Sequence, residues 1–151
     1  MKKKIYLMSG ILFLGLIVLS LIFKQYGVDT AQLYIQDCNL QEKPCTVLMP
    51  YGKEITFELS PRPVIMNQRI YTIVDANKHS LDTIQLDLKG IEMDMGYNRP
   101  ILKDVENKHL FKQQIYMPAC TSDYMHWQLT YLINFQQKEY SVVFKIKTEK
   151  E

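Results

Sequence analysis

The sequence lacks the signatures of several large functional classes. It has no Gly-x-Ser-x-Gly nucleophile motif, no phosphate-binding loop and no dinucleotide fingerprint. It also has no stripe of basic residues, so nucleic-acid binding has no electrostatic support. Repeats, low-complexity tracts and an internal linker are absent too. These absences favour one compact domain that is not an enzyme.

Cysteine is scarce, with three residues in 151. Cys38 and Cys45 bracket six residues rich in turn formers, and two short strands joined by that turn would bring their Cα atoms within disulfide reach. We therefore predict a Cys38–Cys45 disulfide and an oxidising compartment, which leaves Cys120 as the odd thiol. A Cys38–Cys120 disulfide is the alternative.

Charge is missing from Ile5 to Phe23, directly after Lys2, Lys3 and Lys4. At about 1.5 Å per residue, a helix of this length matches the hydrocarbon core of a bilayer. No small-residue cleavage pattern follows, which favours an uncleaved signal anchor over a cleaved signal peptide. We expect residues 1–26 to be a cytoplasmic tip and a single span, residues 5–23, in a bacterial inner membrane. The lysines before the span place residues 27–151 in the periplasm.

No helical periodicity follows the predicted span, and apolar residues recur instead with a period of two. This pattern is typical of strands with one face on a core. It occurs at 55–59, 70–75, 84–88, 127–135 and 140–147. The short spacing between these runs predicts an all-β fold, an immunoglobulin-like β-sandwich. Residues 136–138 are expected to close a hairpin between the last two strands.

Two segments gather soft sulfur atoms. Met93 and Met95 lie two residues apart in Gly90-Ile91-Glu92-Met93-Asp94-Met95-Gly96-Tyr97-Asn98-Arg99, and an extended strand would point both thioethers to one face. Cys120, Met125 and His126 follow just before Trp127. Because loops from different hairpins meet at one end of a sandwich, the two segments are expected to converge. Thiol and thioether ligands suit Cu(I), with Met93, Met95 and Cys120 as ligands and Met125 or His126 in reserve.

Two other interpretations use the same residues. Methionine fills irregular gaps in cores and free cysteine is often buried, so Met93, Met95 and Trp127 would be core residues of a structural or interaction module. Alternatively, Cys120 would be the nucleophile of a thiol-dependent enzyme, although nothing in the sequence places a base beside it. Solvent exposure separates the first interpretation from a metal site, because ligands must be open to the ion.

The segment from Gly90 to Arg99, followed by Tyr116-Met117-Pro118-Ala119-Cys120 and Trp127, resembles a family of small membrane-anchored periplasmic proteins of Gram-negative bacteria. The family pattern is roughly GMDMG-N-R … LP-C … W. The chain is also similar in outline to the FixH-like and YtkA-like domains. This resemblance implies partners among copper chaperones or cytochrome oxidase assembly proteins. The motif positions that it implies are Met93, Met95, Gly96, Asn98, Arg99, Cys120 and Trp127.

This sequence departs from the family pattern at two places. Glu92 stands where the family has a small residue, and Met125-His126 precede Trp127 where a more basic loop is expected. Both departures lie within the predicted site, so they concern its detailed ligand set.

Overall fold

The computed structural model describes residues 15, 17, 20, 32–106 and 108–150. The chain divides into two units, Met1–Thr30 and Ala31–Glu151. In the first unit Gly15, Ile17 and Ser20 are helical, and the Ser20 hydroxyl donates to the Ile17 carbonyl oxygen at 2.8 Å. The rest of the predicted span lies outside the described residues. Within the described part of the chain, no helix has the length and apolar character to cross a membrane.

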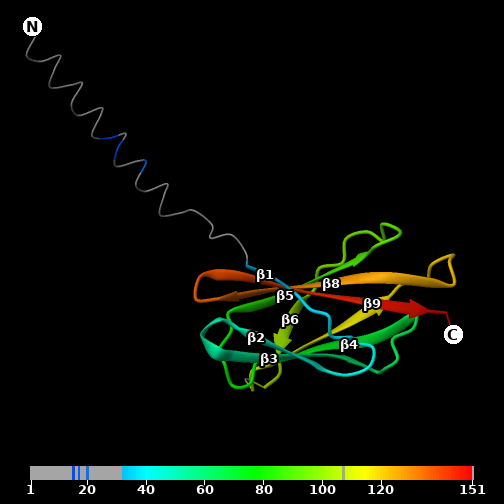
Figure 1. Cartoon of the computed structure of the whole chain (residues 1–151), viewed down its shortest axis with the longest axis horizontal. Coiled ribbons are helices and arrows are strands. Elements are labelled where there is room, and N and C mark those ends of the chain that lie inside the picture. Colours follow the sequence, from blue (N-terminus) through cyan, green and yellow to red (C-terminus); the bar gives the residue numbers. More distant parts are fainter. Residues whose placement is uncertain (1–14, 16, 18–19, 21–31, 107, 151) are drawn as a thin grey trace, which may run out of the picture. The chain divides into compact units, whose positions relative to one another are not determined.

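The second unit is an all-β domain, as predicted (Figure 1). Its described residues form one continuous sheet of nine strands, in the order β1-β9-β8-β5-β6-β7-β4-β3-β2. A short 3-10 turn, η1, lies between β2 and β3 at Pro50–Gly52. The strand bounds are β1 Gln32–Ile35, β2 Cys45–Met49, β3 Lys53–Ser60, β4 Gln68–Asp75, β5 Thr83–Gly90, β6 Ile101–Asp104, β7 Leu110–Met117, β8 Tyr124–Phe135 and β9 Lys138–Glu149.

Strand β6 lets the sheet fold back on itself. Its first half pairs with β5, where Leu102 lies opposite Ile84, and its second half pairs with β7, where Lys103 lies opposite Lys112. The strands on the two sides of β6 therefore form two layers that pack face to face (Figure 1). The finer assignment to the immunoglobulin-like class stays a prediction.

Aromatic side chains join the two layers at the centre of the core. The Phe57 ring on β3 lies 4.8 Å from the Tyr131 ring on β8 and 5.2 Å from the Phe144 ring on β9, measured between centroids. All three side chains are fully buried. Their positions follow from the period-two pattern, because alternate residues of β3, β8 and β9 point to the same side of the sheet.

The predicted hairpin between β8 and β9 is confirmed. Phe135 pairs with Lys138, and the two residues between them have positive φ, 53° at Gln136 and 61° at Gln137. Two central residues with positive φ are typical of the two-residue turn whose twist matches antiparallel strands. The turn therefore forms without the Asn-Gly or Asp-Gly pair that usually marks it in a sequence.

The Cys38–Cys45 disulfide is confirmed, with a Cα–Cα distance of 5.9 Å. The prediction that two strands of one hairpin carry this disulfide is wrong. Strand β1 instead pairs in parallel with β9, while β2 pairs with β3. The loop is closed by its own turn, in which the Glu42 amide donates to the Asn39 carbonyl oxygen at 3.1 Å.

One buried polar contact crosses the core between the layers. The hydroxyls of Thr72 on β4 and Tyr131 on β8 lie 2.7 Å apart, and both residues are fully buried. Burial raises the pKa of Tyr131 far above its ordinary value, so the phenol keeps its proton. Each hydroxyl depends on the other, because a buried group without a hydrogen-bond partner is costly.

Replacing Tyr131 by Phe is expected to lower the free energy of unfolding by about 1–3 kcal/mol, since the Thr72 hydroxyl would then be buried without its partner. Denaturant unfolding measures the change. The double variant Thr72→Val/Tyr131→Phe should recover most of the loss, and Tyr71→Phe on the exposed face of β4 should have little effect. A single variant as stable as the wild type would contradict this account.

Candidate functional site

Gly90 is where the two sulfur-bearing segments meet. It is the last residue of β5, pairs with Trp127 of β8, and is buried. A Cβ atom added to Gly90 would lie 2.1 Å from the Met125 Cε and 2.4 Å from the Met93 carbonyl oxygen. Real Cβ atoms do not approach other atoms so closely, so this position needs a glycine. The loop after β5 can therefore fold directly over the start of β8.

The two methionines of this loop do not share one strand face. The strand ends at Gly90, so the expectation of an extended strand through Met93 and Met95 is wrong. The Met93 side chain is 45% exposed, whereas Met95 is half-buried and packs against the core. The loop turns around Met95, where the Gly96 amide donates to the Asp94 carboxylate at 2.9 Å and Gly96 has a φ of 79°.

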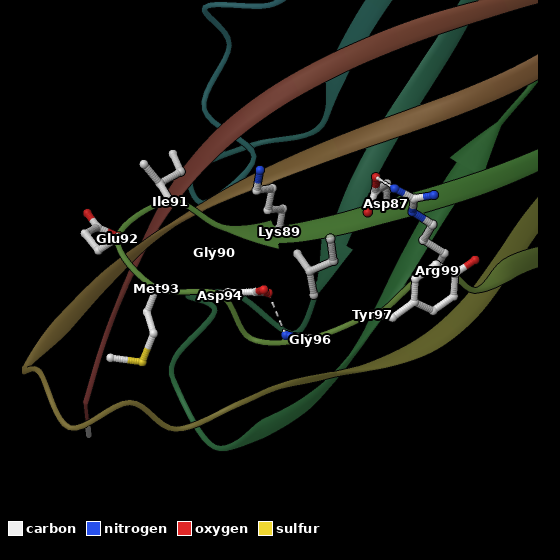
Figure 2. A pocket seen from close by; sticks show the side chains of 11 residues that line it. Asp87, Lys89, Gly90, Ile91, Glu92, Met93, Asp94, Gly96, Tyr97 and Arg99 are labelled. Carbon is white, nitrogen blue, oxygen red and sulfur yellow. Dashed lines mark hydrogen bonds and ion pairs between the residues drawn. The ribbon is translucent and has the colours of Figure 1, made fainter.

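Met93 lies beside the free thiol. The Cys120 Sγ is 4.0 Å from the Met93 Sδ, although 27 residues separate them in the chain. Figure 2 shows the Met93 side chain extending from its loop toward the yellow segment that precedes β8, where Cys120 lies. Cys120 is half-buried and is the free cysteine of the described residues. The predicted convergence of the two segments is therefore present for this sulfur pair.

The surroundings of Cys120 favour its ionised form. Hydrogen bonding from the Ser122 backbone lowers the pKa of the Cys120 thiol below its ordinary value and outweighs the opposing effect of desolvation. The loop that carries the thiol is fastened to the end of β9, because the Lys150 ammonium donates to the Thr121 carbonyl oxygen at 2.9 Å. A thiolate is the form of cysteine that binds metal ions.

The next predicted ligand, His126, is bonded to the methionine loop, which is the segment 91–100 between β5 and β6. The Glu92 carboxylate accepts a hydrogen bond from the His126 amide at 2.9 Å and also contacts the His126 Nδ1. The hydrogen bond to the His126 side chain lowers the pKa of Glu92 below its ordinary value, and the bond from the His126 backbone amide adds a smaller effect in the same direction. No sequence spacing signals this link, since Glu92 and His126 lie 34 residues apart.

Met125 and Trp127 belong to the core. Met125 and Trp127 are each 1% exposed, and the Trp127 Nε1 donates to the buried Thr148 hydroxyl at 2.9 Å. For Trp127 this matches the core interpretation of the sequence. Met125 is placed inside β8 against Gly90, so its thioether has no open path to a solvent ion in this conformation.

Of the remaining motif residues, Gly96 and Arg99 line a shallow hollow of about 530 Å³ formed by the end of β5 and the loop that follows it (Figure 2). The Arg99 guanidinium is 2.9 Å from the Asp87 carboxylate and lies over the Tyr97 ring, with 5.1 Å to its centroid. The Asn98 carbonyl oxygen accepts a hydrogen bond from the Leu88 amide at 3.1 Å. Asn98 and Arg99 therefore hold the returning loop against β5.

Among the described residues, no group of three or more His, Cys, Asp or Glu side chains is placed to hold a metal ion. A site at this end therefore depends on thioether ligands together with Cys120. No family model, curated protein or solved structure gives a significant match to the chain. The family resemblance drawn from the two motifs stays a prediction.

Replacing Gly90 by Ala should lower the free energy of unfolding by about 1–3 kcal/mol, because the new methyl group overlaps Met125 and the loop backbone. It should also speed the reaction of Cys120 with a thiol reagent, as Met93 is pushed away. Gly52→Ala is the control, since Gly52 has a positive φ but open space around it. Because alanine at Gly52 is strained by the positive φ alone, thiol reactivity is the deciding comparison, and equal reactivity of Cys120 in the two variants would contradict the packing argument.

The Glu92–His126 link should weaken in acid. A carboxyl group whose pKa is lowered by folding stabilises the folded state above its unfolded pKa, and this contribution is lost as the pH falls through the folded pKa. The wild type should therefore melt at a higher temperature than Glu92→Gln at neutral pH. This difference in melting temperature should disappear at pH values below the ordinary pKa range of glutamate. Thermal melts across this range measure it. If the difference in melting temperature instead grew as the pH fell, the Glu92–His126 link would not stabilise the folded state in the way described.

Proposed function

We propose that this protein is a membrane-anchored periplasmic accessory protein that binds Cu(I) through Met93 and Cys120, in copper handling or cytochrome oxidase assembly. The observation that carries the proposal is the 4.0 Å distance between the Met93 Sδ and the Cys120 Sγ. Cu(I) prefers thiolate and thioether ligands to oxygen donors. The two sulfur ligands come from segments far apart in the chain, and Met93 is open to solvent.

The separation of the two sulfur atoms fits one shared ion. Bonds from zinc, a comparable ion, to sulfur are about 2.3 Å long, and a similar length is expected for Cu(I). Two sulfur atoms 4.0 Å apart can then bind the same ion at an angle of roughly 120°, which is the angle of a trigonal site. The lowered pKa of Cys120 adds to this by favouring the thiolate.

The compartment and the finer fold class are part of the proposal. A disulfide at Cys38–Cys45 supports an oxidising compartment such as the periplasm. The immunoglobulin-like class is supported by two packed layers and by the parallel pairing of the first strand, β1, with the last, β9. The anchor rests on the uncharged segment from residue 5 to residue 23 and the lysines before it.

The second candidate is an interaction module that binds no metal. The burial of Trp127 and Met125 favours it, because these motif residues already have a packing role. In this case the exposed Met93 would contact a partner protein, and its thioether would be replaceable by an aliphatic side chain of similar size.

A competition titration distinguishes the two candidates. The full-length protein is titrated with Cu(I) against a chromogenic chelator, beside the variants Met93→Leu and Cys120→Ser. Each variant should lose at least about tenfold in affinity, or about 1.4 kcal/mol, because each removes one sulfur ligand. Met49→Leu is the matched control, as Met49 is buried on β2, away from the sulfur pair. Unchanged affinity in both site variants would falsify the proposed function.

A further inference from the structure

Strand β1 carries two apolar side chains on the outside of the domain. Leu33 and Ile35 are 62% and 67% exposed, whereas Tyr34 between them packs against the core. Successive side chains of a strand point to opposite sides of the sheet. Leu33 and Ile35 therefore both face away from the core, on the same side of β1.

These two side chains continue an apolar surface on β9 and β8. Ile35 lies opposite Val143 of β9, which is 6% exposed although it also faces away from the core. Leu33 of β1 and Leu132 of β8 lie opposite Ser141, one on each side of β9. Contiguous apolar side chains on the solvent side of a sheet mark contact with a protein or a membrane. We call Leu33, Ile35, Leu132 and Val143 the outer patch.

We propose that the outer patch lies on the periplasmic surface of the bilayer, with Leu33 and Ile35 among the lipid headgroups. This inference goes beyond the Cu(I) site, but it rests on the membrane anchor of the proposed function. An extended chain covers about 3.6 Å per residue, so from Phe23, the last uncharged residue, to Gln32, the first of β1, the chain reaches at most about 32 Å. A tether this short makes the contact intramolecular, so a weak apolar contact is enough.

The opposite edge of the sheet differs from the outer patch in its surroundings. Leu48 on β2 is 65% exposed, but it lies opposite Glu54 of β3, and Thr46 on the same side lies opposite Thr56. Lipid contact there would remove water from a carboxylate and two hydroxyls, which is costly. Leu48 is therefore a matched control, equally exposed and apolar but without apolar neighbours across the strand pair.

The charges around the outer patch favour lipid of neither sign. Acidic and basic side chains are present in similar number, and the Asp87 carboxylate already pairs with Arg99 at 2.9 Å. The contact would then depend on apolar burial, so vesicles of zwitterionic phosphatidylcholine should be enough. The charged residues on this side of the sheet, in or next to the rows that contain the patch, are Asp37, Asp87, Lys89, Arg99, Lys103, Glu139 and Lys145.

Quenching by brominated lipid tests the inference on the full-length protein. Trp127 is the one tryptophan of the chain and is 1% exposed, so it gives the same background in every variant. Ile35→Trp and Leu48→Trp are reconstituted into phosphatidylcholine vesicles with and without bromine on the acyl chains. Bromine should reduce the added emission of Ile35→Trp and leave that of Leu48→Trp and the wild type almost unchanged.

Two further variants keep the test independent of one substitution. Leu33→Trp, which leaves Ile35 in place, should be quenched in the same way. Adding Leu33→Glu to Ile35→Trp should recover most of the lost emission, because a carboxylate resists removal from water. Circular dichroism of each variant checks that the sheet is intact.

Flotation of the vesicles separates this inference from the proposed function. A protein that does not float with the lipid contradicts the anchor, and the inference with it. If the protein floats but bromine affects the patch variants and Leu48→Trp equally, the anchor stands and the bilayer contact is wrong. If Ile35→Trp emits at a shorter wavelength than Leu48→Trp without being quenched, protein, such as a second copy, covers the patch and lipid contact is ruled out. Cu(I) affinity plays no part in this readout.

Discussion

The close packing at Gly90 is the constraint on which the candidate site depends. A hydrogen atom in place of a side chain lets the loop after β5 cross directly over the Met125 side chain and the start of β8. That crossing leaves Met93 on the surface next to Cys120, while Met95 turns back toward the core. A larger residue at position 90 would separate these segments, because its side chain would overlap the Met93 backbone as well as the Met125 side chain. The geometry of the sulfur pair is therefore set by packing as much as by ligand chemistry.

Short polar contacts then fix the loops that carry the two sulfur atoms. Glu92 ties the methionine loop to the amide of His126, and Lys150 ties the Cys120 loop to the end of β9. A third contact holds the disulfide loop in the same way. The Gln41 amide group donates to the Val64 carbonyl oxygen at 2.9 Å and accepts from the Val64 amide at 2.7 Å. The loops at this end of the domain are thus held by side chains on neighbouring strands and loops, and a rigid frame of this kind is what a ligand set needs.

The core and the candidate site draw on the same two segments but on different residues. Trp127 and Met125 point inward from β8, where they complete the packing between the layers. Met93 and Cys120 lie at the rim. The metal and core interpretations of the sequence are therefore not exclusive alternatives for the motif as a whole. Each applies to part of it, and alternation along β8 together with the turn after Gly90 decides which residue goes where.

The sequence by itself determined the all-β class, the strands β3, β4, β5, β8 and β9, the hairpin at Gln136–Gln137 and the Cys38–Cys45 disulfide. These features depend on local alternation or on a short loop, which can be followed along the chain. Tertiary structure alone decided the others. Strand β7 has Gln113 and Gln114 at its centre, which hide its alternation, and β1 pairs with a strand more than a hundred residues away. The Glu92–His126 link and the meeting of Met93 with Cys120 depend on how two loops pack. Such contacts join positions far apart in the chain, and their energies depend on neighbours that no local pattern specifies.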